Sequence, residues 1–361
     1  MAPAVSHEQW MHEAIQCALL GSGNVSPNPR VGCVIVRDDE IIARGWHKNY
    51  RGIHAEVDAL QSFQGEPSTA TMYVSLEPCA HIGKQPPCVD AIVASGIPNV
   101  VVGMTDPNPL VAGRGIAFLR DHGINVTEGI LRDACQWTNR WFSFHVLTGR
   151  SYVTSKIATS LDLAVSAAAG SGRWITSPES RQIVHTMRSE YDAVMVGVGT
   201  VLADDPLLTV RDANGRDPIR LIVDANCRTP LTSKIVQSAK EIRTVIFCSE
   251  NSIDSMIARE LQVAGVSVVG MPSTDQRLDP EAIVATSGEM GISSILLEGG
   301  PRLSQSFLNA SCVNEIALHI APTFLNPAEH WFESVAPQGF HAHSCSLVGP
   351  DVHLVFTSDR S

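Results

Sequence analysis

Apolar positions in the N-terminal part of the chain alternate between helical and strand spacing. Trp10, Ala14 and Cys17 recur at helical intervals after Ser6, which starts a capping-box pattern, and Gly21 predicts the end of this helix. Apolar runs at residues 31–36 and 41–46 flank an acidic turn and predict an antiparallel hairpin. The pattern then predicts helices that begin near residues 55, 88 and 114, and strands at 72–75 and 100–104.

A second series of apolar runs begins near Tyr152, after the polar and glycine-containing segment 148–150. Ser177 followed by Pro178 is typical of a helix start. The strands predicted in this part cover residues 152–158, 193–198, 219–223, 244–248, 266–269, 295–297, 315–320 and about 352–356. Alternating helices and strands favour helices packed on mostly parallel sheets. The sequence therefore predicts an α/β protein with domains at residues 1–149 and 150–361.

The composition is that of a globular protein and argues against several classes of function. The 361 residues are 44% hydrophobic, and 26 basic against 37 acidic residues give a net charge of −11. An acidic chain does not favour general binding to nucleic acid. The sequence has neither a signal-peptide pattern nor an apolar run of about 18 residues, so we expect a cytoplasmic protein without a membrane span. The nine scattered cysteines indicate reduced thiols, some of which could hold a metal.

One imidazole, two thiols and one carboxylate form the most informative pattern. His54 and Glu56 are followed by Cys79 and Cys88, and both cysteines come directly after a proline. Three protein ligands leave the fourth position of a tetrahedral Zn²⁺ open for water, as in a catalytic site, and zinc lowers the pKa of that water to about 7. Glu56 lies close enough to serve as a proton shuttle without binding the metal. Packing cysteines and a surface histidine are the alternative interpretation.

The longer motifs around these residues carry a family resemblance. The His-x-Glu and Pro-Cys elements match the signature of zinc deaminases, but eight residues separate the cysteines where that signature has two. This wider spacing resembles the bifunctional deaminase-reductases of riboflavin biosynthesis. The matching segments are residues 26–36 (SPNPRVGCVIV), 45–47 (GWH), 54–56 (HAE), 76–88 (LEPCAHIGKQPPC) and 106–109 (DPNP).

The resemblance implies a cytidine-deaminase-like three-layer N-terminal domain and assigns roles within it. Proteins of this family use Zn²⁺ to deaminate 2,5-diamino-6-ribosylamino-pyrimidinone 5'-phosphate, a small phosphorylated pyrimidine. It implies that His54, Cys79 and Cys88 ligate the zinc and that Glu56 is the general acid and base. Positions that hold the substrate are Asn28, His47, His81 and Lys84. Asp106 and Asn108 also match family positions, although Asp-Pro and Asn-Pro are common in turns.

The resemblance continues through the C-terminal part, where the family has a dihydrofolate-reductase-like domain that uses NADPH to reduce the ribosyl group to ribityl. The matching segments are 156–162 (KIATSLD), 174–177 (WITS), 197–206 (GVGTVLADDP) and 298–301 (EGGP). It implies catalytic roles for Lys156 and Asp204. Implied NADPH contacts are Ala158, Trp174, Thr200, Asp204, Gly300, Pro301, Arg302, Leu303, Ser304, Gln305 and Ser306, and implied substrate contacts are Arg188, Leu208, Arg211 and Glu298. Without the resemblance, Trp174 could be a core aromatic, Arg188 a solvated helix residue and Asp204 a turn residue.

Two positions depart from the family pattern. Leu163 stands where the family has glycine, and its β-carbon would obstruct a positive φ or a close backbone approach. Gly172 stands where the family presents a substrate-binding serine. A deaminase with a degenerate, non-catalytic reductase-like domain is therefore the alternative function.

Proteins of other classes fit the sequence less well. A zinc-stabilised binding protein has no need of a free carboxylate such as Glu56 beside an open metal position. Deamination of bases in tRNA or DNA is disfavoured by the charge of −11 and by an aromatic content of only 6%. We expect a homo-oligomer formed through the C-terminal domain.

Overall fold

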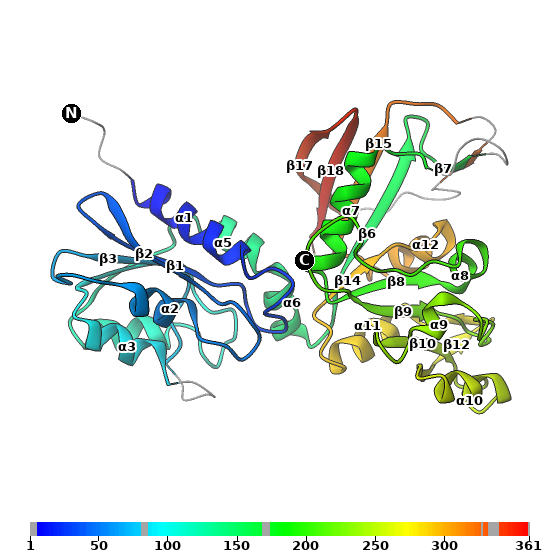
Figure 1. Ribbon diagram of the computed structural model, residues 1–361, viewed down its shortest axis with the longest axis horizontal. Coiled ribbons are helices and arrows are strands. Elements are labelled where there is room, and N and C mark those ends of the chain that lie inside the picture. Colours follow the sequence, from blue (N-terminus) through cyan, green and yellow to red (C-terminus); the bar gives the residue numbers. More distant parts are fainter. Residues whose placement is uncertain (1–5, 81–85, 168–173, 326–327, 331–338, 360–361) are drawn as a thin grey trace. The chain divides into compact units, whose positions relative to one another are not determined.

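The chain forms two compact units, Met1–Thr148 and Gly149–Ser361. The computed structural model describes residues 6–80, 86–167, 174–325, 328–330 and 339–359 (Figure 1). We describe each unit by itself.

The first unit is built on a five-stranded sheet with the order β2-β1-β3-β4-β5. Its strands are β1 (Gly32–Arg37), β2 (Glu40–Trp46), β3 (Thr71–Leu76), β4 (Asn99–Met104) and β5 (Asn125–Glu128). The predicted hairpin is present as the antiparallel pair β1 and β2, whereas β3, β4 and β5 are parallel. Because β3 and β4 are parallel, the loops that follow them lie at the same end of the sheet.

Helices cover both faces of this sheet, so the unit has the three layers that were expected (Figure 1). One face packs against α1 (His7–Leu19) and α5 (Arg132–Thr138) through a core that includes Met11, Ile15 and Cys135. The other face packs against α2 (Ala55–Ser62), α3 (Cys88–Ser95) and α4 (Arg114–Asp121), and α6 (Arg140–Thr148) ends the unit.

The sequence prediction needs corrections in this unit. Ser6 is the N-cap residue of α1, but its side chain accepts no capping hydrogen bond, contrary to the capping-box prediction. Elements β5, α5 and α6 were not predicted. All three are short, and their apolar residues form no clear period.

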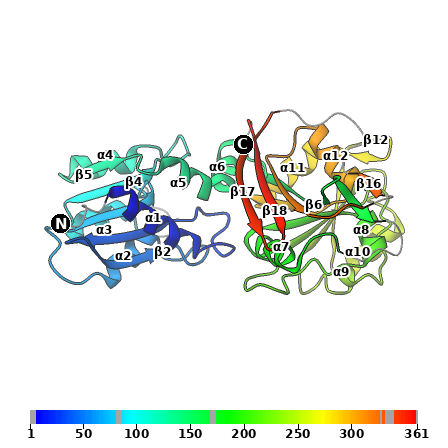
Figure 2. The same cartoon turned by 90° about the horizontal axis from the view of Figure 1, so that it is seen from above.

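The second unit is built on a nine-stranded sheet with the order β11-β10-β9-β8-β14-β6-β15-β18-β17. Its strands are β6 (Tyr152–Ser160), β8 (Ala193–Gly197), β9 (Ile219–Val223), β10 (Thr244–Ser249), β11 (Ser267–Met271), β14 (Ser294–Leu297), β15 (Glu315–Ala321), β17 (Phe340–Val348) and β18 (Asp351–Ser358). Strands β17 and β18 lie side by side at one edge and are antiparallel (Figure 2). Strand β18 is also antiparallel to β15, while the other neighbouring strands are parallel. All eight predicted strands of this unit are present.

Two apolar cores lie on the two faces of the large sheet. Helices α11 (Pro280–Glu289) and α12 (Pro301–Asn309) bury Ile283 and Phe307 in one core. Helices α8 (Val198–Asp204), α9 (Lys234–Gln237) and α10 (Met256–Val263) contribute to the other. Helix α7 (Pro178–Glu190) begins as predicted, because the Ser177 side chain accepts a hydrogen bond from the Ser180 N–H.

Two small two-stranded sheets and one edge strand complete the unit. Strands β7 (Ala164–Ala167) and β16 (Ala328–His330) pair with each other, as do β12 (Ser273–Thr274) and β13 (Arg277–Leu278). Strand β17 was not predicted, because its sequence lacks regular alternation and most of its residues are exposed. Within the described residues, every helix is too short or too polar to cross a bilayer.

Candidate functional site

Three local features of the first unit bring the predicted metal ligands together. His54 is the N-cap residue of α2, Cys88 is the first residue of α3, and Cys79 lies in the loop after β3. His54 Nδ1 lies 3.2 Å from Cys88 Sγ and 3.5 Å from Cys79 Sγ. Tetrahedral zinc with typical Zn–N and Zn–S bonds places such atoms about 3.6 Å apart. The donor atoms therefore fit a zinc ion, and among the described residues they form the one such group of three.

The start of α3 favours a thiolate at this cluster. The backbone N–H of Cys88 donates to Cys79 Sγ at 3.3 Å. The Cys88 side chain, and after it His54 and this backbone N–H, lower the pKa of Cys79 to about 4 against the opposing effect of burial. A thiolate is the form of cysteine that binds a metal.

Glu56 lies in the first turn of α2 and is only 3% exposed. Burial, together with the negative charge of Cys79, raises the pKa of Glu56 to about 7. A carboxyl group with a pKa near neutrality can both take up and release a proton. Glu56 is not one of the three clustered donors, as expected for a proton carrier beside the metal.

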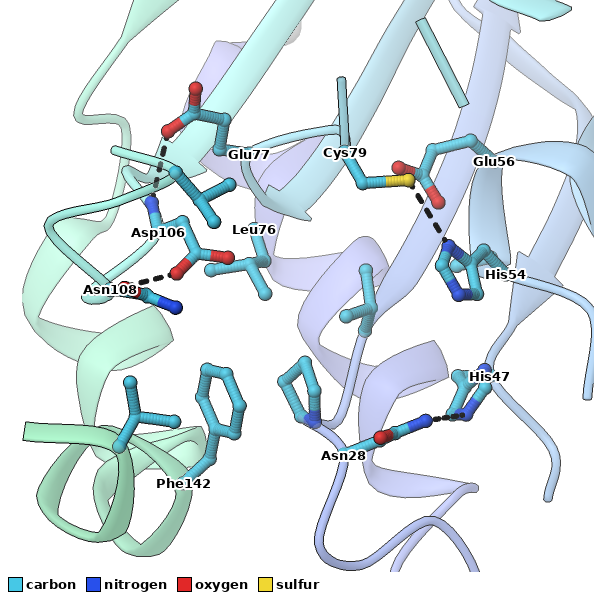
Figure 3. Close-up of a pocket in the computed structure, with 15 residues that line it drawn as sticks. Asn28, His47, His54, Glu56, Leu76, Glu77, Cys79, Asp106, Asn108 and Phe142 are labelled. Carbon is cyan, nitrogen blue, oxygen red and sulfur yellow. Dashed lines mark hydrogen bonds between the residues drawn. The ribbon is translucent and has the colours of Figure 1, made fainter. Parts of the chain in front are cut away.

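A cavity of about 280 Å³ opens onto the cluster (Figure 3). His47 and Asn28 line it, and the His47 ring packs edge-to-face on His54, with ring centroids 5.5 Å apart. His47 Nδ1 lies 3.1 Å from the Ile53 carbonyl oxygen, which can only accept. His47 Nε2 is therefore the acceptor for Asn28 Nδ2 at 3.3 Å.

The opposite wall of the cavity comes from the loop after β4 and from α6. Asp106, Asn108 and Val111 contribute from the loop, and Phe142 and Val146 from the helix (Figure 3). The sequence motifs did not identify α6 as part of the cavity lining. The aromatic pair at residues 141–142 is the one available signal, and nothing in the sequence links it to the zinc motif. His81 and Lys84 lie outside the described residues.

In the second unit, three of the predicted residues form a cluster of charged side chains. Glu298 follows β14, Lys156 lies on β6, and Arg188 is on α7. Arg188 donates to both carboxylate oxygens of Glu298 at 2.6 and 2.9 Å, and Lys156 Nζ lies 3.5 Å from Oε2. Burial would raise the pKa of Glu298, but Arg188 and Lys156 lower it to about 2. The Arg188 side chain is only 12% exposed and is held in this ion pair, so it is not a solvated helix residue.

Several of the predicted NADPH contacts come from the end of the sheet at which Glu298 follows β14. Ala158 is on β6, Thr200 is in the α8 helix that follows β8, and residues 300–306 open α12 after β14. A β-carbon added at Gly199 or Gly300 would meet nothing within 4 Å, so the backbone there is open to a ligand. Open backbone at helix starts beyond parallel strands suits a phosphate-bearing cofactor. The residues present therefore fit NADPH.

Other predicted residues of the second unit are more scattered. Trp174 is 58% exposed and is not a core aromatic, and the Arg181 guanidinium lies 5.2 Å from its ring centroid. Leu208 is buried in the core beside Val194, so its side chain faces the protein interior. Arg211 is exposed, and its N–H donates to His185 Nδ1 at 3.3 Å. Asp204 is exposed at the end of α8, whereas Lys156 forms an ion pair with Glu298.

Leu163 adopts the backbone conformation that its side chain was expected to obstruct. Its φ is 60°, in the left-handed region, and its N–H donates to the Ser160 carbonyl at 3.0 Å. The Ser160 hydroxyl accepts from Ala164 N–H at 3.1 Å and donates to Asp162 in a short hydrogen bond. These bonds hold the turn despite the strain, so this part of the expectation is wrong. Gly172 lies outside the described residues.

Family models match both units. The model of the "Cytidine and deoxycytidylate deaminase zinc-binding region" matches residues 4–104, and that of the "RibD C-terminal domain" matches residues 151–354. The second of these matches covers more than half of the chain.

Relatives match over nearly the whole length. The chain is 42% identical to "Riboflavin biosynthesis protein RibD" of Actinobacillus pleuropneumoniae, covering 87% of this chain and 83% of the relative. It is 37% identical to the protein of the same name from Escherichia coli, covering 96% and 99%. The solved structure of Acinetobacter baumannii RibD superposes with a TM-score of 0.84 at 35% identity, covering 97% of this chain and 98% of that one.

Proposed function

The chain belongs to the RibD family of riboflavin biosynthesis, and from this membership we propose which of its own residues carry the two reactions. It is a bifunctional deaminase and reductase that uses Zn²⁺ and NADPH, as the sequence predicted. Its substrate is a small molecule. Nothing found favours the alternative of a deaminase with a degenerate reductase domain, because relatives match across both units.

We propose that His54, Cys79 and Cys88 hold the zinc and that Glu56 moves the proton in deamination. Bound zinc supplies a Lewis acid that makes water nucleophilic at neutral pH. Glu56 takes a proton from the attacking water and delivers it to the leaving amine, so that ammonia departs. The supporting observation is the placement of a buried carboxyl group with a pKa of about 7 beside three clustered metal donors.

The cavity beside this cluster is the proposed site for 2,5-diamino-6-ribosylamino-pyrimidinone 5'-phosphate. Asn28 and His47 lie next to His54 and would orient the pyrimidine ring. His81 and Lys84 are proposed to bind the phosphate, because an acidic protein needs local cationic groups for a phosphomonoester. Binding of nucleic acid is not part of this proposal.

For the reductase we propose that Lys156 and Asp204 act near the reacting centre. We further propose that Arg188, Arg211 and Glu298 face the ribosyl phosphate substrate, as does the backbone of Leu208, whose side chain is buried. NADPH supplies the hydride. The buried ion pairs of Glu298 fix the Lys156 ammonium group, which can then donate to the ribosyl oxygen as the sugar is reduced. Ala158, Trp174, Thr200, Asp204 and residues 300–306 are the proposed cofactor contacts.

We also propose a cytoplasmic homo-oligomer formed through the second unit. Strand β17 is at the edge of its sheet, and Leu347 on it is 78% exposed. An exposed edge strand with an apolar side chain is suited to pairing with a second copy.

Glu56→Gln tests the deaminase assignment. The amide keeps the shape of the side chain but cannot carry the proton, so ammonia release should fall about 10²- to 10⁴-fold. Metal analysis should show that zinc is retained, and the exposed Glu8→Gln variant should deaminate at the wild-type rate. Wild-type deamination by Glu56→Gln would refute the assignment.

A further inference from the structure

Glu77 accepts hydrogen bonds from a backbone loop that lines the deaminase cavity. The sequence motifs assigned no role to this residue. It directly follows β3, and its backbone N–H donates to the Met104 carbonyl at 2.9 Å. Its side chain is buried, with the residue 4% exposed. Cys79 lies two residues further along the chain.

The Glu77 carboxylate accepts four backbone hydrogen bonds. Oε2 accepts from Asp106 N–H at 3.0 Å and from Gly113 N–H at 2.9 Å. Oε1 accepts from Gly115 N–H at 2.8 Å and from Ile116 N–H at 3.3 Å. The first pair ties together the two ends of the loop 106–113, and the second satisfies amides in the first turn of α4.

The loop held in this way forms one wall of the cavity. Asp106 Oδ1 accepts from Asn108 N–H at 2.8 Å, and Asn108 Oδ1 accepts from Leu110 N–H at 3.0 Å. These bonds fix the side chains of Asp106 and Asn108, which line the cavity together with Val111 (Figure 3). The position of this wall therefore depends on the Glu77 carboxylate, which binds both ends of the loop.

The start of α4, which Glu77 also binds, packs against the loop that carries Cys79. A β-carbon on Gly115 would lie 2.0 Å from the Pro78 carbonyl oxygen, so the first turn of α4 rests directly on the backbone just before Cys79. Glu77 thus sets the distance between the metal-binding loop and the Asp106–Asn108 wall, between which the substrate would lie.

We propose that Glu77 is a positioning residue for the deaminase, which acts through the wall formed by Asp106 and Asn108 to fix the pyrimidine substrate relative to the metal site. This inference rests on the proposed function of the cavity. It predicts a defect in substrate binding and turnover with the metal still bound.

The test is Glu77→Gln in the full-length zinc-loaded enzyme. The amide keeps the size of the side chain. Its NH₂ group, however, would replace a carboxylate oxygen that accepts two backbone N–H bonds, so two N–H donors would lose their acceptor. The wall should shift, and a shift of about 1 Å can lower kcat/KM up to about 100-fold. We expect a higher KM for 2,5-diamino-6-ribosylamino-pyrimidinone 5'-phosphate, unchanged zinc content and an unchanged reductase rate. Glu128→Gln, an acid-to-amide change at an exposed position of the same unit, should behave as the wild type.

A double variant separates positioning from general support of the fold. If Glu77 acts through the wall, Glu77→Gln should have little further effect on KM in an Asn108→Ala background. Independent, multiplying effects would overturn the proposal, as would an unchanged KM in Glu77→Gln or a loss of zinc that accounts for its defect. If Glu77→Gln does not fold, Glu77→Asp decides in the same way, since the shorter carboxylate should still raise KM. Absence of deamination by the wild type would instead refute the proposed function.

Discussion

Leu163 shows how a single side chain can conflict with the backbone that it occupies. Its φ of 60° costs a non-glycine residue about 1–2 kcal/mol. The side chain is 43% exposed and gains little from burial, so the turn is maintained by the hydrogen bonds around Ser160. The strain therefore remains in the folded protein next to β6, the strand that carries Lys156.

Leu163→Gly should remove this strain. Glycine is more flexible in the unfolded chain by about 0.5–1 kcal/mol, so we expect a net gain in unfolding free energy of about 0.5–1 kcal/mol. Urea denaturation, followed through the unfolding transition of the second unit, would measure this change in unfolding free energy. Leu161→Gly is the matched control, because Leu161 is similarly exposed at 51% but has no positive φ, and that variant should lose stability. A loss of stability in Leu163→Gly would contradict the strain argument.

The starts of two helices, α2 and α3, and the more C-terminal helix α6 contribute residues to the candidate deaminase site. Helix α2 begins after His54 and α3 begins at Cys88, so both helix starts direct ligands toward one point. Helix α6 comes much later in the chain, beyond the segment matched by the zinc-binding family model, and contributes Phe142 and Val146 to the cavity. Part of the apolar lining of the cavity is thus supplied by an element outside the motif.

Phe142→Ala should weaken substrate binding by the deaminase. Removing the ring takes away apolar contact worth about 1.4 kcal/mol, which corresponds to a tenfold rise in KM. Steady-state ammonia release would measure this, with kcat changing less than KM. Phe144→Ala, on the same helix but outside the cavity lining, is the control and should leave KM unchanged. Equal effects of the two variants would show that the helix acts only through stability.

The molecule divides its chemistry between two compact units, each with its own sheet and its own apolar cores. The candidate metal donors lie in the first unit, and the Lys156–Glu298–Arg188 cluster lies in the second. No metal donor group is found in the described part of the second unit. The two reactions should therefore respond differently to loss of the metal.

Removal of zinc with a chelator should abolish deamination and leave the reductase active. Both rates would be measured on the same sample, with ammonia release for the first and NADPH absorbance for the second. Added Zn²⁺ should restore deamination in the presence of a thiol reductant, because the imidazole and the reduced thiols are then available as ligands. A parallel loss of NADPH oxidation would show that the second unit depends on the metal.

Much of the fold was predictable because its strongest elements are periodic. Central strands of the large sheet such as β8 and β14 are largely apolar runs, and Ser177-Pro178 marks the start of α7 by local chemistry alone. Strand β17 was missed because most of its residues are exposed and lack a regular alternation. Helices α5 and α6 were missed because they are short and their apolar residues form no clear period. Ser6 failed as a capping side chain although its sequence pattern is typical.

The amino-acid sequence by itself determined the candidate metal donors, the candidate acid beside them and the family, because these depend on residue types at short spacings. Only the tertiary structure decided which distant segments complete each site. Glu77 and the amides of residues 106–116, Phe142 beside the metal cavity, and the ion pairs of Glu298 with Lys156 and Arg188 are such cases. Their physical reason is shared: burial and hydrogen bonding between remote segments are set by the packing of sheets and helices, and no local pattern records them.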